Sequence, residues 1–529
     1  MNTPVNRRQF LRDASILATG SMLLNASNPD ASAAFAGRES NPNALVVDPE
    51  PLFAISPRFY MQFMEPLGVT DASVEAAWDY DRDDWRADLV KTVSDLSPDT
   101  IRWGGNFIRY YKWREGVGPL QDRPPMFNYD WGGKETNRIG THELVDLCRR
   151  VGAEPLICVN FMSDGVRRHW KTVHGENRCG DAEEAADWVS YANDPDNRER
   201  KKHGILQPYN IRWWQIGNET SYASDGFQLD QAADHTLTFA KAMKKKDPSI
   251  TLIGWGDDRG HDGRFWAGEM LKRAGEYLDC VALHMMGMRP RRKNTVLAGD
   301  AYQREPEQAW EELLELTQTV ESRIQRMKAI IESQHSSACI AVTEGHLSIN
   351  PHNSNPILQE WLSSVYHARS MNIYQRHGDR VSICTGADFC GTRWTVNAVK
   401  VQVPRGISYL MPVASIMRLF KKHNGKHGIG TLSCPADLDV AASRSDTAVY
   451  LHVVNLNYRK PVQTTFAVRG KEIAGVRVFE IAPENPRQSV DQDRPDVFAP
   501  KEKVLPPGRT WTWNFPAASV SAVELQLKA

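Results

Sequence analysis

The 529-residue sequence lacks an excess of charge of either sign, because 64 basic and 65 acidic residues leave a formal net charge of −1. Charges of both signs are interspersed, so no electrostatic surface for nucleic acid or for an anionic membrane is expected. Long hydrophobic runs are also missing. The apolar segment Ile16–Leu24 is too short to span a bilayer, and no other segment is long and apolar enough. Neither nucleic acid nor a membrane is therefore predicted as a partner.

Cysteine motifs are absent as well. The eight cysteines form no Cys-x-x-Cys pair and no Cys/His ligand spacing, so the sequence indicates neither a zinc site nor a redox motif. Cysteines inside apolar runs are predicted to be buried thiols, and the sequence assigns no disulfide. The predicted buried thiols are Cys148, Cys158, Cys280, Cys339 and Cys384, whereas Cys179, Cys390 and Cys434 are predicted in loops.

The first 36 residues resemble a bacterial twin-arginine export signal. Arg7-Arg8 precedes Phe10-Leu11, the apolar segment follows, and small residues at 31–36 offer cleavage sites. The alternative is a chance arginine pair in a disordered tail. We expect export by the twin-arginine route to the periplasm or beyond, and residues 1–36 are left out of the fold prediction.

Short apolar runs alternate with amphipathic segments between about residues 58 and 400, which predicts parallel βαβ units of an α/β fold. Eight runs favour a (β/α)₈ TIM barrel. A doubly wound open sheet is the second choice, but the Gly-x-Gly-x-x-Gly turn that it favours is missing. The predicted strands are Phe59–Met64, Thr100–Gly104, Glu154–Phe161, Ile211–Gly217, Ile250–Gly256, Leu278–Met285, Cys339–Thr343 and Val381–Thr385, and the predicted helices include Asp84–Asp95, Thr141–Val151, Leu229–Lys246 and Glu311–Gln334.

The pattern changes after residue 400. Helical periodicity over Tyr409–Lys422 gives way to β-branched and alternating runs separated by Pro- and Gly-containing turns. Residues 401–529 are therefore predicted as a C-terminal all-β sandwich domain, with 43–57 as a candidate additional strand.

Two carboxylates follow apolar strands. Glu219 ends the fourth predicted strand in Trp213-Trp214-Gln215-Ile216-Gly217-Asn218-Glu219, and Glu344 ends the seventh. A retaining glycosidase uses one protonated carboxylic acid and one carboxylate nucleophile about 5–5.5 Å apart. Glu219 would need a raised pKa, from apolar walls or from the charge of Glu344. Arg102 is the expected partner that keeps Glu344 ionised.

Together with further motifs, these two carboxylates make the chain resemble glycoside hydrolase family 51. This family contains α-L-arabinofuranosidase-type enzymes, which have a barrel fold and a retaining mechanism. The resemblance covers roughly residues 59–420. It implies Glu219 as acid/base and Glu344 as nucleophile, without metal or cofactor. It also implies substrate-contacting or nucleophile-holding roles for Glu65, Arg102, Asn106 and Asn218, and a place near the pocket for His284. The motifs are Gln62–Gly68, Arg102–Phe107, Gly116–Pro119, Glu135–Glu143, Ala185–Asn193 and Trp214–Glu219.

Some positions depart from the family pattern. Thr343 and Gly345 flank the nucleophile where an Asp-Glu-Trp type motif is usual, Met286 stands for a Tyr, and Trp394 for a Gln. The loop Ser163–Asp181 is enlarged. The sequence therefore predicts an exported retaining α-L-arabinofuranosidase acting on an oligo- or polysaccharide. A different sugar, endo action and a non-catalytic glycan-binding barrel remain alternatives, and a homo-oligomer stays open because family members often form one.

Overall fold

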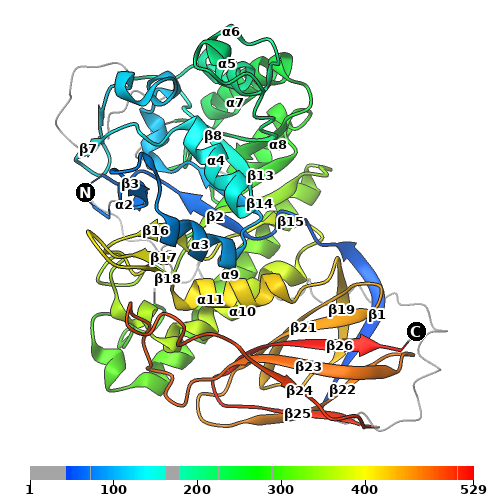
Figure 1. The fold of residues 1–529 in the computed structure, drawn as a ribbon. Coiled ribbons are helices and arrows are strands. Elements are labelled where there is room, and N and C mark those ends of the chain that lie inside the picture. The colour runs from blue at the N-terminus through cyan, green and yellow to red at the C-terminus, as the bar shows by residue number, and fades with distance from the viewer. Residues whose placement is uncertain are drawn as a thin grey trace, which may run out of the picture. The chain divides into compact units, whose positions relative to one another are not determined.

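The computed structural model describes residues 43–68, 70–71, 73–162, 178–222, 227–261, 263–286, 290–508 and 510–528, and within this part of the chain the strands form two large sheets (Figure 1). The predicted export signal lies outside the described residues, and so does most of the predicted loop Ser163–Asp181.

The larger sheet contains one strand from each of the eight predicted runs, and neighbouring strands pair in parallel. A parallel bridge between Tyr60 and Cys384 joins the last of these strands to the first, with Met61 N–H donating to the Cys384 carbonyl at 2.9 Å. The run of strands therefore closes on itself. The strands are β2 (Met61–Met64), β5 (Thr100–Trp103), β8 (Glu154–Val159), β9 (Trp213–Ile216), β10 (Thr251–Trp255), β13 (Cys280–Met285), β14 (Cys339–Gly345) and β15 (Val381–Ile383), followed by β16 (Asp388–Gly391), β17 (Asn397–Val401) and β18 (Ser408–Leu410).

Most residues of the eight strands are buried, as expected for parallel strands that are covered on both faces. Three predicted helices begin elsewhere than expected. The predicted helix Asp84–Asp95 starts at Ala87, because Asp84–Trp85 pairs with Trp78–Asp79 in a short hairpin. The predicted helix Glu311–Gln334 starts at Pro306, and the predicted helix Tyr409–Lys422 starts at Pro412, because Ser408–Leu410 pairs as a strand with Asn397–Val401. Proline suits the first turn of a helix. The helices are α2 (Ser73–Ala76), α3 (Ala87–Leu96), α4 (Thr141–Val151), α5 (Ala182–Asn193), α6 (Arg198–Lys202), α7 (Leu229–Lys246), α8 (Trp266–Ala274), α9 (Pro306–Ser333), α10 (Ser364–Arg376) and α11 (Pro412–Lys422), and the short strands are β3 (Trp78–Asp79), β4 (Asp84–Trp85), β6 (Met126–Phe127), β7 (Lys134–Glu135), β11 (Gly260–His261) and β12 (Arg264–Phe265).

The second sheet holds nine strands in the order β24-β23-β26-β21-β20-β19-β1-β22-β25. Val478 of β23 and Phe515 of β25 lie near opposite ends of this order and yet share one apolar core, so the sheet curls over that core. The N-terminal strand β1 joins it between β19 and β22. The strands are β1 (Ala44–Ala54), β19 (His427–Ser433), β20 (Leu438–Arg444), β21 (Ala448–Asn455), β22 (Val462–Val468), β23 (Ile473–Ile481), β24 (Lys501–Val504), β25 (Trp511–Phe515) and β26 (Val520–Leu527).

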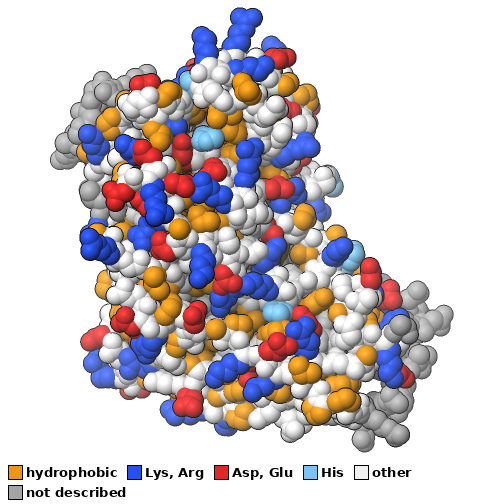
Figure 2. Space-filling model, in the orientation of Figure 1, with side chains coloured by type: hydrophobic (Ala, Val, Ile, Leu, Met, Phe, Trp, Pro, Cys, Tyr) orange, Lys and Arg blue, Asp and Glu red, His pale blue; other side chains and the backbone are white. Residues whose placement is uncertain are grey.

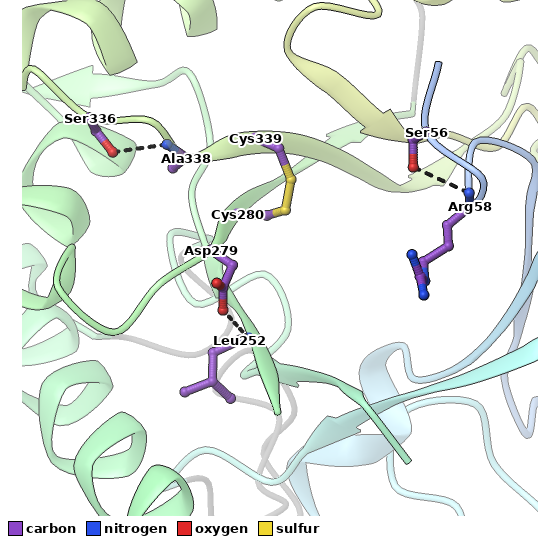
Figure 3. Close-up of a disulfide and its surroundings, with 8 residues drawn as sticks. All are labelled: Ser56, Arg58, Leu252, Asp279, Cys280, Ser336, Ala338 and Cys339. Atoms are coloured by element: carbon purple, nitrogen blue, oxygen red, sulfur yellow. Dashed lines mark hydrogen bonds between the residues drawn. A yellow bond between two sulfur atoms is a disulfide. The ribbon is translucent and has the colours of Figure 1, made fainter. Parts of the chain in front are cut away.

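Two cysteine predictions are wrong. Cys280 and Cys339 are not free thiols but form a disulfide between register partners of β13 and β14, with 4.3 Å between their Cα atoms (Figure 3). The sequence could not pair them, because 59 residues separate them and only the strand order makes them neighbours. Cys390 lies buried in β16 rather than in a loop.

Acidic and basic side chains are interspersed over the face shown in Figure 2, as the balanced composition predicts. Among the described residues, no helix combines the length and the apolar character that a membrane crossing requires.

Candidate active site

Glu219 follows β9 in a tight backbone turn. Gly217 has φ +74° and Glu219 itself has φ +53°. A left-handed backbone is unfavourable for a residue with a Cβ, and such residues concentrate at functional sites. The carboxyl group is nevertheless almost entirely buried. The chain therefore accepts a strained conformation in order to hold a buried acid at the end of this strand.

Glu344 lies near the end of β14, opposite His284 of β13 in a register that shifts by one residue just before this pair. A carboxylate oxygen of Glu219, a ring nitrogen of His284 and a carboxylate oxygen of Glu344 all lie within 4.8 Å of one another. The closest oxygens of the two carboxyls thus lie within 4.8 Å, which favours a retaining pair, about 5–5.5 Å apart, over an inverting pair, about 6.5–9.5 Å apart.

Arg102 connects three strands beneath this pair. Its guanidinium is fully buried, and it donates to Glu344 Oε1 at 2.9 Å, Asn218 Oδ1 at 2.7 Å and Gln215 Oε1 at 3.0 Å. Asn218 in turn donates to Asn106 Oδ1 at 3.3 Å. The structure thus brings Arg102, Asn218 and Asn106 together at Glu344, and it places Arg102 in the contact expected from the sequence.

The glycines after β5 leave room for these side chains. A Cβ on Gly104 would lie 2.6 Å from the Arg102 guanidinium carbon, and one on Gly105 would lie 2.3 Å from the Glu65 carboxyl carbon. Gly105 also has φ +98°. Glu65 Oε1 accepts hydrogen bonds from the Phe107 N–H at 3.0 Å and from the Trp131 indole at 3.1 Å. The Gly-Gly pair is therefore required for close packing around two site residues.

Burial raises the pKa of both Glu219 and Glu344. At Glu219, the charges of Arg109 and Arg102 oppose this effect, with Arg109 at 3.8 Å. At Glu344, Arg102 opposes it through a direct ion pair. Two buried carboxyls this close share a proton readily. Because Arg102 contacts only Glu344 of the two, Glu219 is the group that holds the proton.

His284 joins the two carboxyls. Its Nδ1 lies 3.0 Å from Glu219 Oε1 and 3.5 Å from Glu344 Oε2, while Nε2 lies 3.1 Å from Thr343 Oγ1. Burial lowers the pKa of His284 to about 3, so the ring is neutral. A neutral imidazole has one N–H, so one of its nitrogens donates and the other accepts. His284 is thus a neutral ring that bridges the two carboxyl groups.

Several residues of the site were missed by sequence reasoning. Arg109 approaches Glu219, and Trp131 donates to Glu65 and packs edge-on against Trp394 with ring centroids 5.4 Å apart. His346 pairs through Nδ1 with Asp388 Oδ1 at 2.8 Å. The signal for His346 was its position two residues after Glu344, whereas nothing in the sequence marked Arg109 or Trp131.

Two carboxylates and an imidazole within 4.8 Å also form a ligand set that a divalent cation could use. The guanidinium groups of Arg102 and Arg109, at 2.9 Å from Glu344 and 3.8 Å from Glu219, already supply positive charge there. Their charge disfavours a cation at this position.

A cavity of about 1240 Å³ opens beside Glu219. It exceeds the roughly 300–1,000 Å³ of typical small-molecule pockets, so it has room for more than one sugar unit. Its walls come from the loops after β9, β10, β13 and β14 and from one side of α9. They are formed by Glu219, Tyr222, Asp258, Arg259, Met286, Pro290, Arg291, Thr319, Arg323, Arg326, His346, Ser348, Ile349, Asn350 and His352.

Retaining glycosidases use this kind of fold and site, in which a closed run of parallel strands carries two buried carboxyl groups close together. Residues 92–304 match the family described as alpha-L-arabinofuranosidase 1 domain, a range that includes His284 and ends before Glu344. The intracellular exo-alpha-(1->5)-L-arabinofuranosidase of Halalkalibacterium halodurans is 34% identical over 246 residues, which are 44% of this chain and 45% of that protein. A probable alpha-L-arabinofuranosidase C of Aspergillus niger is 32% identical over 220 residues, 39% of this chain and 40% of that protein. The chain thus spans less than half the length of these curated relatives.

Solved structures show the same fold over almost the whole chain. An alpha-L-arabinofuranosidase of Thermotoga maritima in complex with arabinose has a TM-score of 0.71 at 22% identity and covers 92% of this chain and 100% of its own. The GH51 arabinofuranosidase of Xanthomonas axonopodis pv. citri has a TM-score of 0.73 at 21% identity, with 91% and 99% covered. The resemblance to glycoside hydrolase family 51 that the sequence motifs indicate is therefore confirmed.

Proposed function

We propose that this protein is a retaining glycoside hydrolase that releases terminal α-L-arabinofuranosyl or related furanosyl residues from glycans. The observation that carries the proposal is the pair Glu219 and Glu344, with oxygens within 4.8 Å of each other and only Glu344 held by the buried Arg102. The names of the relatives supply the sugar, because the curated matches act on arabinofuranosides.

The mechanism follows from the two environments. Glu219 gives its proton to the glycosidic oxygen while the Glu344 carboxylate attacks the anomeric carbon from the opposite face, which breaks the glycosidic bond and leaves a glycosyl ester. Glu219, now ionised, takes a proton from water, and the water oxygen attacks the anomeric carbon to release Glu344. Asn218 donates to the sugar hydroxyl next to the anomeric carbon. Arg102 keeps Glu344 in place in both steps.

The test is turnover of a panel of nitrophenyl furanosides and pyranosides, with Glu344→Ala as the diagnostic variant. Glu344→Ala should lose turnover of the nitrophenyl α-L-arabinofuranoside, and azide should restore part of it by attacking in place of the carboxylate. Normal turnover by Glu344→Ala would refute the nucleophile assignment. Hydrolysis of a pyranoside without any furanoside would refute the sugar assignment.

A second candidate function is endo-action on a glycan chain. The 1240 Å³ cavity beside Glu219 favours it, because release of one terminal sugar needs less space. Product analysis on a polysaccharide separates the two, since an endo-enzyme releases oligosaccharides early and an exo-enzyme releases only monosaccharide. A glycan-binding barrel without catalysis would bind the same polysaccharide and release nothing.

The finer architecture and the location belong to the same proposal. The closed run of parallel strands supports a (β/α)₈ TIM barrel over about residues 58–400, and the curled second sheet supports a β-sandwich domain over 401–529 with β1 added. Export through the twin-arginine route is supported by Arg7-Arg8 and by the Cys280–Cys339 disulfide, which suits an oxidising compartment. The matched relative of Halalkalibacterium halodurans is named intracellular. Export would therefore place this protein in a different compartment from that relative.

A further inference from the structure

The side chains that line the cavity beside Glu219 carry more positive than negative charge. Four arginines line it, Arg259, Arg291, Arg323 and Arg326, whereas its only carboxylates are those of Glu219 and Asp258 among the described residues. A wall with this balance attracts a negative group on whatever occupies the cavity.

Asp257 and Asp258 do not cancel the excess positive charge. Both are buried, and Arg323 pairs with both, through a short contact with Asp258 and at 3.4 Å from Asp257. Arg323 thereby takes up much of the negative charge and also donates to the His284 carbonyl at 2.7 Å. Asp257, Asp258 and Arg323 thus form a buried ion-pair cluster, which Arg259 and Arg326 contact from the solvent side.

Arg259 and Arg326 extend from this base toward solvent. The Arg259 side chain is 68% exposed, lies 3.9 Å from Asp257, and is stacked on the Tyr222 ring at 4.7 Å. Arg326 is 52% exposed and touches Asp258 through one nitrogen at 3.1 Å. Each keeps further N–H donors available, because a guanidinium has five. On the rim, Arg291 donates to Gln318 and Thr319, two neutral side chains.

His346 adds a positive charge in the wall of the same cavity. The ring is buried, its Nδ1 pairs with Asp388, and its Nε2 has no hydrogen-bond partner in the described part of the chain. Asp388 and the neighbouring Glu344 and Glu219 outweigh burial and raise the pKa of His346, so the ring favours its charged form. The Nε2 atom is itself buried, so His346 acts on a ligand in the cavity through its charge and not through a hydrogen bond.

We propose that this cavity is an anion subsite, in which Arg259 and Arg326, with Arg291 at the rim, bind a carboxylate on the sugar that carries the scissile bond, and the charge of His346 adds to the attraction. The substrate class is then a glycan that bears hexuronic acid next to the arabinofuranosyl group. The inference rests on the proposed function, because it places the uronic acid on the leaving-group side of Glu219.

The experiment uses two substrates that differ only at C6 of the leaving sugar, an arabinofuranosyl galactose and the matching arabinofuranosyl galacturonic acid. The protein should turn over the acidic substrate with a kcat/KM at least about tenfold higher at low salt, since hydrogen bonds to charged groups discriminate by that factor or more. The ratio should fall as salt screens the exposed arginines. Equal or lower kcat/KM for the acidic substrate would overturn the inference while leaving the proposed function intact.

Variants locate the effect. Arg259→Gln and Arg326→Gln should each lower the acid-to-neutral ratio, and their combination should bring it close to one. Arg292→Gln is the matched control, because Arg292 is a neighbouring arginine paired with Glu315 and Glu311 and absent from the cavity walls. A ratio that falls equally in Arg292→Gln would mean that general surface charge, and not this subsite, selects the substrate.

Binding separates the subsite from catalysis. Glu219→Gln should bind the acidic disaccharide more tightly than the neutral one in calorimetry, and His346→Gln introduced into that background should reduce the difference. Equal affinities would overturn the subsite. If the unmodified protein bound the acidic disaccharide preferentially but cleaved neither, the proposed function would fail while the anion site would stand.

Discussion

Replacing Arg102 with Leu removes the only cation in direct contact with Glu344 among the described residues. The guanidinium is fully buried and makes an ion pair of 2.9 Å, so its loss leaves a buried carboxylate unpaired. Breaking a buried pair in this way costs about 3–5 kcal/mol. Unfolding entropy of about 2.1 cal/mol/K per residue, over roughly 490 residues from Asn43 to Ala529, is close to 1 kcal/mol/K. Arg102→Leu should therefore lower Tm by about 3–5 °C.

The pH dependence of kcat/KM and of Tm in Arg102→Leu tests the role of Arg102 more directly than the Tm at one pH. Arg102 lowers the pKa of Glu344, so its removal raises that pKa further. Only the ionised carboxylate attacks, so the acidic limb of kcat/KM should move to higher pH. A raised folded-state pKa gives stability that is present below the unfolded pKa and is lost as pH rises through the folded value. The Tm deficit of Arg102→Leu should therefore be small near pH 4 and grow toward pH 8.

Two further variants complete this test, with Tm and pH–rate profiles as the measurements. Arg102→Leu combined with Glu344→Gln removes both charges and should be more stable than Arg102→Leu alone. Arg200→Leu is the matched control, because Arg200 is also fully buried but donates to the backbone carbonyls of Tyr191 and Pro195. It should lower Tm without moving the acidic limb. An unchanged acidic limb in Arg102→Leu, with a Tm deficit independent of pH, would refute the role assigned to Arg102.

Three other perturbations have defined outcomes. Glu219→Ala should lower kcat/KM by about 10²–10⁴-fold for a glycoside with a poor leaving group and far less for a dinitrophenyl leaving group; an equal loss for both would contradict its role as acid. Gly105→Ala places a Cβ 2.3 Å from the Glu65 carboxyl carbon, so kcat/KM should fall on the order of a hundredfold in a variant that circular dichroism shows to be folded; wild-type kinetics would exclude that contact. Cys280→Ala with Cys339→Ala opens a loop of 59 residues, which costs about 4 kcal/mol and should lower Tm by about 4 °C; a Tm equal to that of the oxidised protein would show that the bond does not form.

The local sequence determined the elements and the kind of site. Apolar runs of strand length alternate with amphipathic segments, and this periodicity was sufficient to place a strand in each of eight runs and to locate helices such as Leu229–Lys246. Asn218-Glu219 and Thr343-Glu344 could be recognised as site candidates because a polar residue at the end of a buried strand needs a functional reason. Helix starts were less well predicted, since the short hairpin of β3 and β4 depends on pairing.

Only the tertiary structure decided which of these residues meet. Strand order makes Cys280 and Cys339 neighbours, brings Arg109 and His346 to Glu219, and aligns Arg259 with Arg326 along one cavity. None of these relations has a signature in sequence, because a parallel sheet joins residues that are far apart along the chain by hydrogen bonds between strands. The protonation states follow from the same cause: both carboxyls are buried, and the ion pair of Arg102 with Glu344 distinguishes Glu344 from Glu219, two residues that are chemically identical in the sequence.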